Sequence, residues 1–293
     1  MKNIKFHFFG IKVKLTFLLI LFFHTTILTA QTLKLPQRKA DALTGSAFAK
    51  SIADSSLTLE QREKVIFNEI KNGNVPNFLR KLTNITNGNE LDFGIDKITI
   101  SYYVLPDYFC IGNDEDFFYI PMTPILAQKV ADLTKCSLLT RKMVDKVYKN
   151  AMIKLEPKPI PPTKAMTTVP VFIAHNQIIK TQLKDFDAQH KNSELTAGHK
   201  KDIIISNKIY GEQTPRVVIY GWHKLDGKPI QPVYNKHTNT WADYSHGIRL
   251  VQQNVWINGK KTKIAKVLKD EKLSILLSHE GKIEKPFYPA TKY

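Results

Sequence analysis

The sequence predicts an α/β or α+β protein, with a helical N-terminal part packed on a mixed, β-rich C-terminal core. Three observations lead to this class. The 293 residues are 43% hydrophobic and 24% charged, which is typical of globular proteins. Helix caps and helical periodicity concentrate between residues 57 and 155, whereas short β-branched and aromatic runs concentrate after residue 200. Two cysteines are too few for a disulfide scaffold or for a zinc site made only of thiolates.

The first thirty residues have the pattern of a secretory signal peptide. Four lysines and no acidic residue come before the apolar run 15–23 (LTFLLILFF). This run is too short to span a bilayer, and the small residue Ala30 stands where cleavage is expected. We therefore expect residues 1–30 to be removed, giving a secreted or periplasmic protein with no stable membrane insertion after cleavage. The alternative is an uncleaved N-terminal anchor.

The chain is basic, with a formal net charge of +17. A basic exported protein is expected to meet polyanions of the cell envelope, so an envelope polymer or a glycan is the predicted partner. The sequence has no helix-turn-helix, zinc-finger or RNA-binding signature, and no nucleic-acid partner is predicted. The lysines are spread along the chain, which also fits a generic solvated surface.

The N-terminal elements begin after a polar stretch. Residues 31–56 predict a flexible lead-in. Thr58 and Gln61 form a capping-box pattern at the start of a helix that Gly73 ends. A second short helix is expected over residues 77–82.

A strand and two helices are predicted next. Residues 97–105 are rich in β-branched and aromatic side chains and predict a strand, with 117–120 as its expected partner. Thr123 followed by Pro124 predicts a capped helix start, and Thr140 caps a further helix with an apolar stripe.

A proline-rich connector, residues 156–164 (EPKPIPPTK), is the best candidate for a boundary. It separates a predicted helical and mixed subdomain, 57–155, from a β-rich subdomain, 165–293. The alternative is one continuous domain whose surface the connector crosses.

Beyond the connector we expect a helix over about 169–183. Three strand-like runs follow, at 202–206, 216–220 and 248–256. Asn258-Gly259 predicts a β-hairpin, because a type I′ turn needs positive φ at both central residues.

Three histidines stand beside these strand-like runs. His199 comes just before the first run, together with Asp202; His223 follows the second, and His246 precedes the third. Loops at strand ends often carry sites, because the rigid sheet aims their side chains. If the strands are neighbours, these four residues would converge at one end of the sheet.

One chemistry for such a site is a catalytic metal. His199, Asp202 and His223 have the donor types that hold zinc with one open position for water, whose pKa the metal would lower. The order HKKD, WH, SHG resembles exported wall peptidases of the D-Ala-D-Ala carboxypeptidase type, although the spacing within the first motif differs.

The other chemistry uses no metal. His246 would act as general acid or base, with Asp243 or Asp202 orienting its ring. Tyr244 and Arg249 would then stabilise the charge of the transition state.

The segment Ser245–Leu250 (SHGIRL) resembles the signature of a second wall-enzyme family, the L,D-transpeptidases. That signature carries a nucleophilic cysteine after the glycine and a second histidine upstream, a part that His223 could play. Here Gly247 is followed directly by Ile248, so the cysteine is missing and the acyl-enzyme chemistry of that family cannot occur at this position. The resemblance covers about 30 residues.

The chain is also similar to a family of uncharacterised exported bacterial proteins. The shared blocks include PMTPILAQ, TRKMVD, GHKKD, YGWH and DYSHGIRLV, and the similarity covers most of residues 100–255. This resemblance implies export and supplies no activity.

The predicted function is an exported cell-envelope hydrolase that cleaves an amide or peptide bond of peptidoglycan or a related polymer. One alternative is a polysaccharide lyase, in which Tyr244 and His246 move protons and Arg249 neutralises a uronate. The other is a non-catalytic protein that binds envelope glycans through its basic surface with Trp222 and Trp241.

Other polar residues have structural interpretations. Cys110 and Cys136 are expected to be a disulfide or inert thiols, with Cys136 as a nucleophile at a helix start as the alternative. His175 is expected to be a packed, hydrogen-bonded histidine. Arg141 and Asp145 predict an i,i+4 ion pair, unless that polar face points into a cleft.

Overall fold

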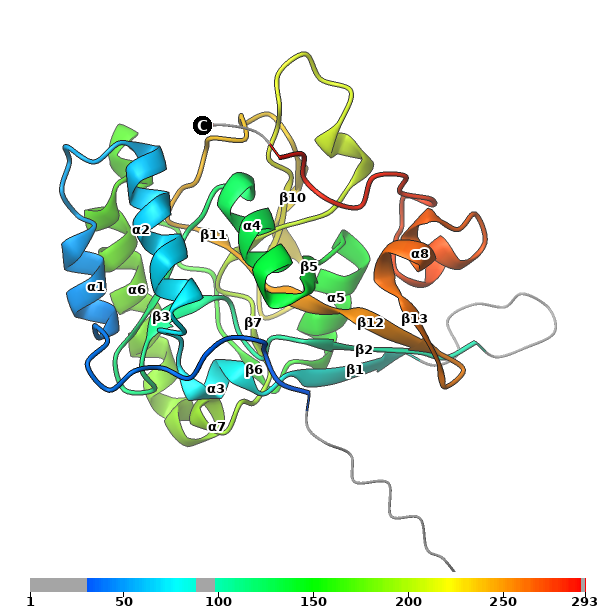
Figure 1. The fold of residues 1–293 in the computed structure, drawn as a ribbon, viewed down its shortest axis with the longest axis horizontal. Helices are drawn as coiled ribbons and strands as arrows, with labels where there is room; N and C mark the ends of the chain where they lie inside the picture. Colours follow the sequence, from blue (N-terminus) through cyan, green and yellow to red (C-terminus); the bar gives the residue numbers. More distant parts are fainter. Residues whose placement is uncertain (1–30, 88–97, 291–292) are drawn as a thin grey trace, which may run out of the picture.

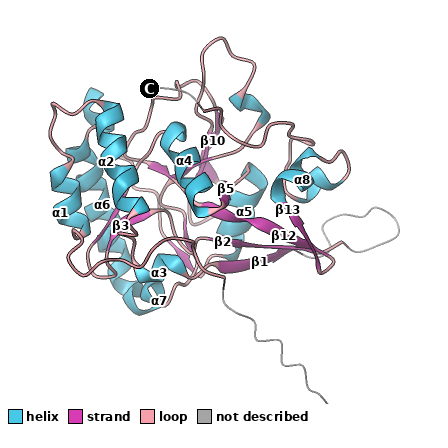
Figure 2. Cartoon of the chain, viewed as in Figure 1, coloured by secondary structure: helices cyan, strands magenta, loops and turns pink. Residues whose placement is uncertain are grey.

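Helices come mainly from the N-terminal part of the chain and strands mainly from the C-terminal part, which confirms the mixed class (Figure 1; Figure 2). The computed structural model describes residues 31–87, 98–290 and 293. The predicted signal peptide lies outside the described residues. Within the described ranges, no helix combines the length and the apolar character needed to cross a membrane.

Three helices begin where the sequence places their caps. The α-helices are α1 (Gly45–Ser51), α2 (Leu59–Lys71), α3 (Asn77–Arg80), α4 (Pro124–Thr134), α5 (Arg141–Asn150), α6 (Val169–Leu183), α7 (Asp187–Lys191) and α8 (Ile264–Lys269). Short 3₁₀ helices are found at Lys164–Thr167, Lys184–Phe186, Asn207–Ile209 and Leu273–Leu276. Thr58 and Gln61 form the predicted capping box of α2. The hydroxyls of Thr123 and Thr140 cap α4 and α5.

The larger sheet joins the two halves of the chain. Its strands are β1 (Thr83–Asn87), β2 (Ile100–Val104), β12 (Leu250–Ile257) and β13 (Lys260–Lys263), in that order, with β5 (Cys136–Leu138) also paired to β12. All pairs are antiparallel. Asn258 and Gly259 have φ of 46° and 76°, which confirms the predicted hairpin between β12 and β13.

The expected pairing of 117–120 with 97–105 is wrong. β2 lies between β1 and β12, so both of its edges are already occupied. Instead, β4 (Phe117–Tyr119) pairs with β3 (Cys110–Gly112). The sequence could not show this, because the partner that takes one edge of β2 comes from far along the chain.

The smaller sheet carries His223 and His246, and His199 comes two residues before one of its strands. Its order is β10 (Pro229–Tyr234), β9 (Ile219–His223), β8 (Lys201–Ile203) and β11 (His246–Gly247). β8 is antiparallel to β9 and parallel to β11. A further parallel pair, β6 (Ile153–Lys154) with β7 (Thr196–Ala197), lies beside the chain that enters β8. Of the three strand-like runs assumed to be neighbours, only the first two pair, as β8 and β9. The third run, 248–256, forms β12 of the larger sheet, and His246 reaches the smaller sheet through the separate strand β11.

One hydrophobic cluster runs through the described chain, from Leu33 to Tyr288. The connector 156–164 therefore does not separate two cores. Residues 31–56 also differ from the expected flexible lead-in, because they include α1, whose Phe48 is fully buried. α1 packs so closely that a Cβ on Gly45 would lie 2.4 Å from the backbone of Phe117.

Candidate functional site

The smaller sheet brings the predicted residues into one layer but gives them different neighbours. His246 lies opposite Lys201 on β8, and Lys201 lies opposite Gly221 on β9. His199, His223 and His246 are each almost completely buried, and each lies next to a different aspartate. The geometry of these three pairs decides what each can do.

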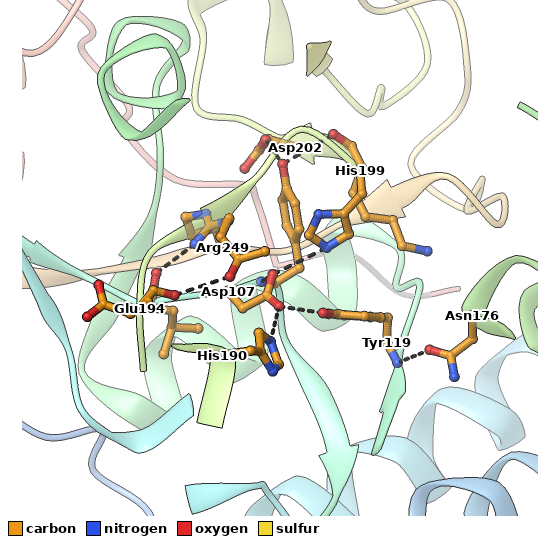
Figure 3. Close-up of polar contacts among 12 residues, drawn as sticks. Asp107, Tyr119, Asn176, His190, Glu194, His199, Asp202 and Arg249 are labelled. Carbon is orange, nitrogen blue, oxygen red and sulfur yellow. Dashed lines mark hydrogen bonds and ion pairs between the residues drawn. The ribbon is translucent and has the colours of Figure 1, made fainter. Parts of the chain in front are cut away.

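His199 belongs to a closed polar cluster around Asp107. His199 Nε2 lies 3.3 Å from one carboxylate oxygen of Asp107, and His190 Nε2 lies 2.8 Å from the other. The Tyr119 hydroxyl donates a short hydrogen bond to the same carboxylate. Figure 3 shows the three side chains pointing toward Asp107. We call Asp107, Tyr119, His190 and His199 the Asp107 cluster.

The electrostatics of the Asp107 cluster keep its carboxylate charged. Burial alone would raise the pKa of Asp107, but His199 and His190 lower it below its ordinary value. Burial, together with the nearby carboxylate, raises the pKa of Tyr119 well above the usual range. The cluster is therefore an ionised aspartate held by a tyrosine hydroxyl and two imidazoles, away from solvent.

Asp202 points to a different partner, the Tyr108 hydroxyl, which donates to it at 2.7 Å (Figure 3). Burial raises the pKa of Asp202 to about 6. The guanidinium of Arg249 lies 4.5 Å from the ring centroid of Tyr108 and donates to the carbonyls of Leu105 and Thr196. Arg249, which is 1% exposed, therefore links segments of the backbone in the interior.

Tight packing explains the glycine of the SHG segment. A Cβ on Gly247 would lie 2.6 Å from the ring of Tyr108 and 2.7 Å from the Cβ of Lys200. Contacts this short do not occur between real side chains, so any larger residue would displace Tyr108 or Lys200. Gly247, in the segment that resembles a wall-enzyme signature, is therefore part of the packed interior.

Lys200 is buried beside His175 and Tyr244. Its Nζ donates to the Tyr244 carbonyl at 2.6 Å and lies 3.2 Å from His175 Nδ1. Burial lowers the pKa of Lys200 to about 7 and that of His175 to about 2. The imidazole of His175 is therefore neutral and accepts from Lys200, in agreement with the packed, hydrogen-bonded histidine expected from the sequence.

Tyr244 is covered by the proline-rich connector, which we call the strap (residues 156–164). The Tyr244 hydroxyl accepts from the Ile160 N–H at 2.8 Å and donates to the Ile160 carbonyl at 2.9 Å. The backbone N–H of Tyr244 also donates to the Met166 carbonyl just beyond the strap. The strap thus holds the predicted catalytic tyrosine in the interior.

His246 and Asp243 are brought together as predicted, although loosely. His246 Nε2 lies 3.7 Å from one oxygen of Asp243, and the other oxygen accepts from the N–H and hydroxyl of Ser245. Burial lowers the pKa of His246 to about 4. His246 is fully buried, so this pair is a neutral imidazole beside a carboxylate in the interior.

His223 is the predicted histidine that lines a surface groove. Its Nε2 lies 3.2 Å from Asp145 Oδ1, and the Tyr220 hydroxyl donates to the same oxygen at 2.6 Å. The ring of His223 stacks on Tyr148, with centroids 4.6 Å apart. The groove has a volume of about 360 Å³ and is lined by Asp145, Tyr148, Lys149, Lys154, His223 and residues 225–227.

Asp145 is the carboxylate that contacts His223 in this groove. Burial would raise the pKa of Asp145, but hydrogen bonds from His223 and Tyr220 lower it below its ordinary value. The predicted ion pair with Arg141 is present at 3.9 Å, so the structure contains both the helical pair and the polar face that points into a groove. The helical spacing alone could not show that His223 also contacts Asp145.

The metal prediction stays open. In the part of the chain that the structure describes, no group of three or more His, Cys, Asp or Glu side chains is placed to hold a metal ion. His199 and Asp202 contact Asp107 and Tyr108, and His223 contacts Asp145. Zinc at His199, Asp202 and His223 therefore remains a prediction for metal analysis.

The cysteines have no role in these sites. Cys110 and Cys136 are free and buried. Cys136 begins β5 and not a helix, and burial raises its pKa to about 11. A thiol with a raised pKa is a poor nucleophile at neutral pH, which favours the inert-thiol interpretation.

Comparison with known proteins gives no family to which these sites could be assigned. No family model, no curated protein and no solved structure matches this chain. The resemblances to wall enzymes and to exported bacterial proteins therefore stay predictions, and function has to be argued from the geometry.

Proposed function

We propose that this protein is an exported hydrolase of the cell envelope that cleaves an amide or peptide bond of peptidoglycan or a related polymer. We place the reaction in the groove at His223. The observation that carries the proposal is the contact between His223 Nε2 and Asp145 Oδ1, 3.2 Å apart, in the wall of an open groove of about 360 Å³. An oriented imidazole beside accessible space is the minimum that general-base hydrolysis needs.

The pair supplies a way to activate water. Asp145 contacts Nε2, which leaves Nδ1 as the ring nitrogen that can take a proton from water. Because the pKa of Asp145 is below its ordinary value, its carboxylate stays ionised and stabilises the imidazolium that forms. The stacked ring of Tyr148 and the hydrogen bond from Tyr220 fix the two partners in place.

The groove carries charges of both signs, because Asp145 and Asp226 line it together with two lysines. Lys149 and Lys154 line it, and the ammonium of Lys154 lies 5.2 Å from the ring centroid of Tyr148. Ammonium groups at the rim attract carboxylates such as those of peptide stems, and the whole chain is basic. The basic charge of the whole chain and the predicted export signal support a polymer of the cell envelope as the substrate.

The geometry gives less support to the lyase alternative. Tyr244 is held under the strap, and Arg249 donates to backbone carbonyls. The alternative of a non-catalytic glycan-binding protein makes its own prediction and is an outcome of the experiment below.

The test is digestion of isolated peptidoglycan by the purified protein. Released fragments are separated by chromatography and identified by mass, and new amino groups are counted. We expect His223→Gln and Asp145→Asn each to lower the rate by about 100-fold or more, as loss of a general base does. His237→Gln is the matched control, because His237 stacks on Trp241 and does not line the groove.

Four results would decide between the alternatives. Equal digestion by wild type and both groove variants would contradict the assignment to His223 and Asp145. Unsaturated sugars that absorb in the ultraviolet would indicate a lyase. Co-sedimentation with wall material without any new product would indicate a binding protein. Stoichiometric zinc in the purified protein, with loss of digestion after chelation, would require a metal in the mechanism.

A further inference from the structure

A second pocket lies away from the His223 groove, between α4, α8 and the C-terminal segment 286–290. Its volume is about 630 Å³, and it shares no lining residue with the groove. Figure 1 shows the C-terminal segment, in red, leaving α8 and running back above α4 in this view. The proposed hydrolysis does not use this pocket.

The walls of this pocket are mostly apolar. Ile125 comes from α4, Ile264 and Ala265 come from α8, and Phe287 and Tyr288 come from the C-terminal segment. Phe287, which lines the pocket, is 44% exposed. The volume lies within the range of small-molecule sites, which are typically about 300–1,000 Å³.

The charged residues that line the pocket are mainly cations. Lys129, Lys263 and Lys269 line it together with one acid, Asp132. The carboxylate of Asp132 already accepts from Gln128 at 2.9 Å, so it is partly compensated within α4. Lys263 is held by Asn254 at 2.8 Å. The local charge therefore favours a ligand with a negative group.

We propose that this pocket binds an amphipathic anion, a single acyl or alkyl chain with a carboxylate or phosphate head. The chain would lie against the apolar walls, and the head would meet the ammonium group of Lys269. Neither feature alone selects this ligand. Apolar walls alone would bind any nonpolar molecule, and lysines alone would bind any anion. This binding is independent of the proposed hydrolase activity.

The ligand class is tested by calorimetric titration with four probes. Decanoate and dodecyl phosphate carry both a chain and an acidic head, decanol carries only a chain, and acetate carries only a head. We expect saturable one-to-one binding of decanoate, dodecyl phosphate or both, and decanol weaker by about tenfold, since it lacks the head-group contact. No saturable binding of either anion, or equal binding of decanol, would overturn the proposal.

Three substitutions locate the site. Ala265→Trp fills the pocket and is expected to abolish binding of decanoate. Lys269→Glu should weaken it by about tenfold, whereas Lys266→Glu, which changes the same charge on α8 but does not line the pocket, should leave it unchanged. Equal effects of the two lysine variants, or full binding by Ala265→Trp with an unchanged melting temperature, would contradict the assignment. Wall digestion should be unaffected by all three.

Discussion

The Asp107 cluster and the His223 groove are built from the same chemical groups in opposite surroundings. In each, a carboxylate is held by a tyrosine hydroxyl and by imidazole: Asp107 with Tyr119, His190 and His199, and Asp145 with Tyr220 and His223. The carboxylate of Asp107 is 1% exposed and that of Asp145 is 32% exposed. The residue types are therefore not what distinguishes a structural cluster from a candidate active site.

The two sites differ in how far solvent reaches the carboxylate and in the free-energy cost of removing one of its hydrogen-bonding partners. A charged group in the interior has no water to replace a lost neighbour, so the Asp107 cluster is expected to stabilise the fold strongly. At the groove, water can solvate Asp145, whose side chain is 32% exposed, so the Asp145 pair is expected to contribute less to stability. This contrast predicts that stability and activity are affected by different substitutions.

The largest expected effect is the loss of stability when the buried Asp107 cluster is disrupted. Asp107→Ala leaves two imidazoles and a tyrosine hydroxyl buried without their acceptor, so the free energy of unfolding should fall by about 3–5 kcal/mol. The matched variant Asp145→Ala should lose about 1 kcal/mol or less. Urea unfolding of both variants measures the difference. Similar losses for the two would mean that burial does not separate the clusters.

Packing around Gly247 gives the next largest effect. Gly247→Ala places a methyl group 2.6 Å from the Tyr108 ring, so the interior must shift. We expect a loss of about 1–3 kcal/mol in the free energy of unfolding, the usual cost of overpacking. Thermal and urea unfolding would measure it. A neutral substitution would show that Tyr108 and Lys200 have room to move, and the interior would then be more adaptable than its contacts indicate.

The third prediction concerns pH. His246 has a pKa of about 4 when folded and about 6.5 when unfolded, so the unfolded chain binds a proton first and stability falls as the pH drops from 6.5 to 4. Asp202 acts in the opposite direction: its folded pKa of about 6 makes stability rise as the pH falls through the same range.

Two variants separate these contributions. Relative to wild type, His246→Gln should lose less stability between pH 7 and pH 5, by about 1–2 kcal/mol, because the titrating imidazole is gone. Asp202→Asn should lose more over the same interval. Melting temperatures at several pH values give the slopes. Parallel slopes for wild type and both variants would contradict the assigned pKa directions.

Local patterns allowed much of the fold to be predicted from the sequence. The caps at Thr58, Thr123 and Thr140 and the turn at Asn258-Gly259 are local signals, and the structure has elements at each of them. Strand partners depend on contacts across the chain, which is why the partner of β2 was mispredicted. The same limit explains why residues 31–56 were expected to be flexible: few local features show that Phe48 will be buried.

The candidate site was predicted less well, for a related reason. His223 was found because it ends a strand-like run, but its partner Asp145 comes from a helix 78 residues away in the sequence. Asp107 also follows a strand, at the end of 97–105, and the same strand-end rule would have found it. No sequence rule separates Asp107 from Asp145, because only the fold decides which carboxylate meets water.

The smallest expected effect concerns the strap, residues 156–164, and its hydrogen bonds to Tyr244. Tyr244→Phe removes both hydrogen bonds to Ile160, and we expect a loss of about 1 kcal/mol in the free energy of unfolding. Because the lost contacts are local, amide hydrogen exchange should accelerate in residues 156–164 but not in β12. Tyr210→Phe is the matched control, since its hydroxyl donates to the Phe287 carbonyl and not to the strap. Unchanged exchange in the strap would mean that its prolines, and not Tyr244, hold it in place.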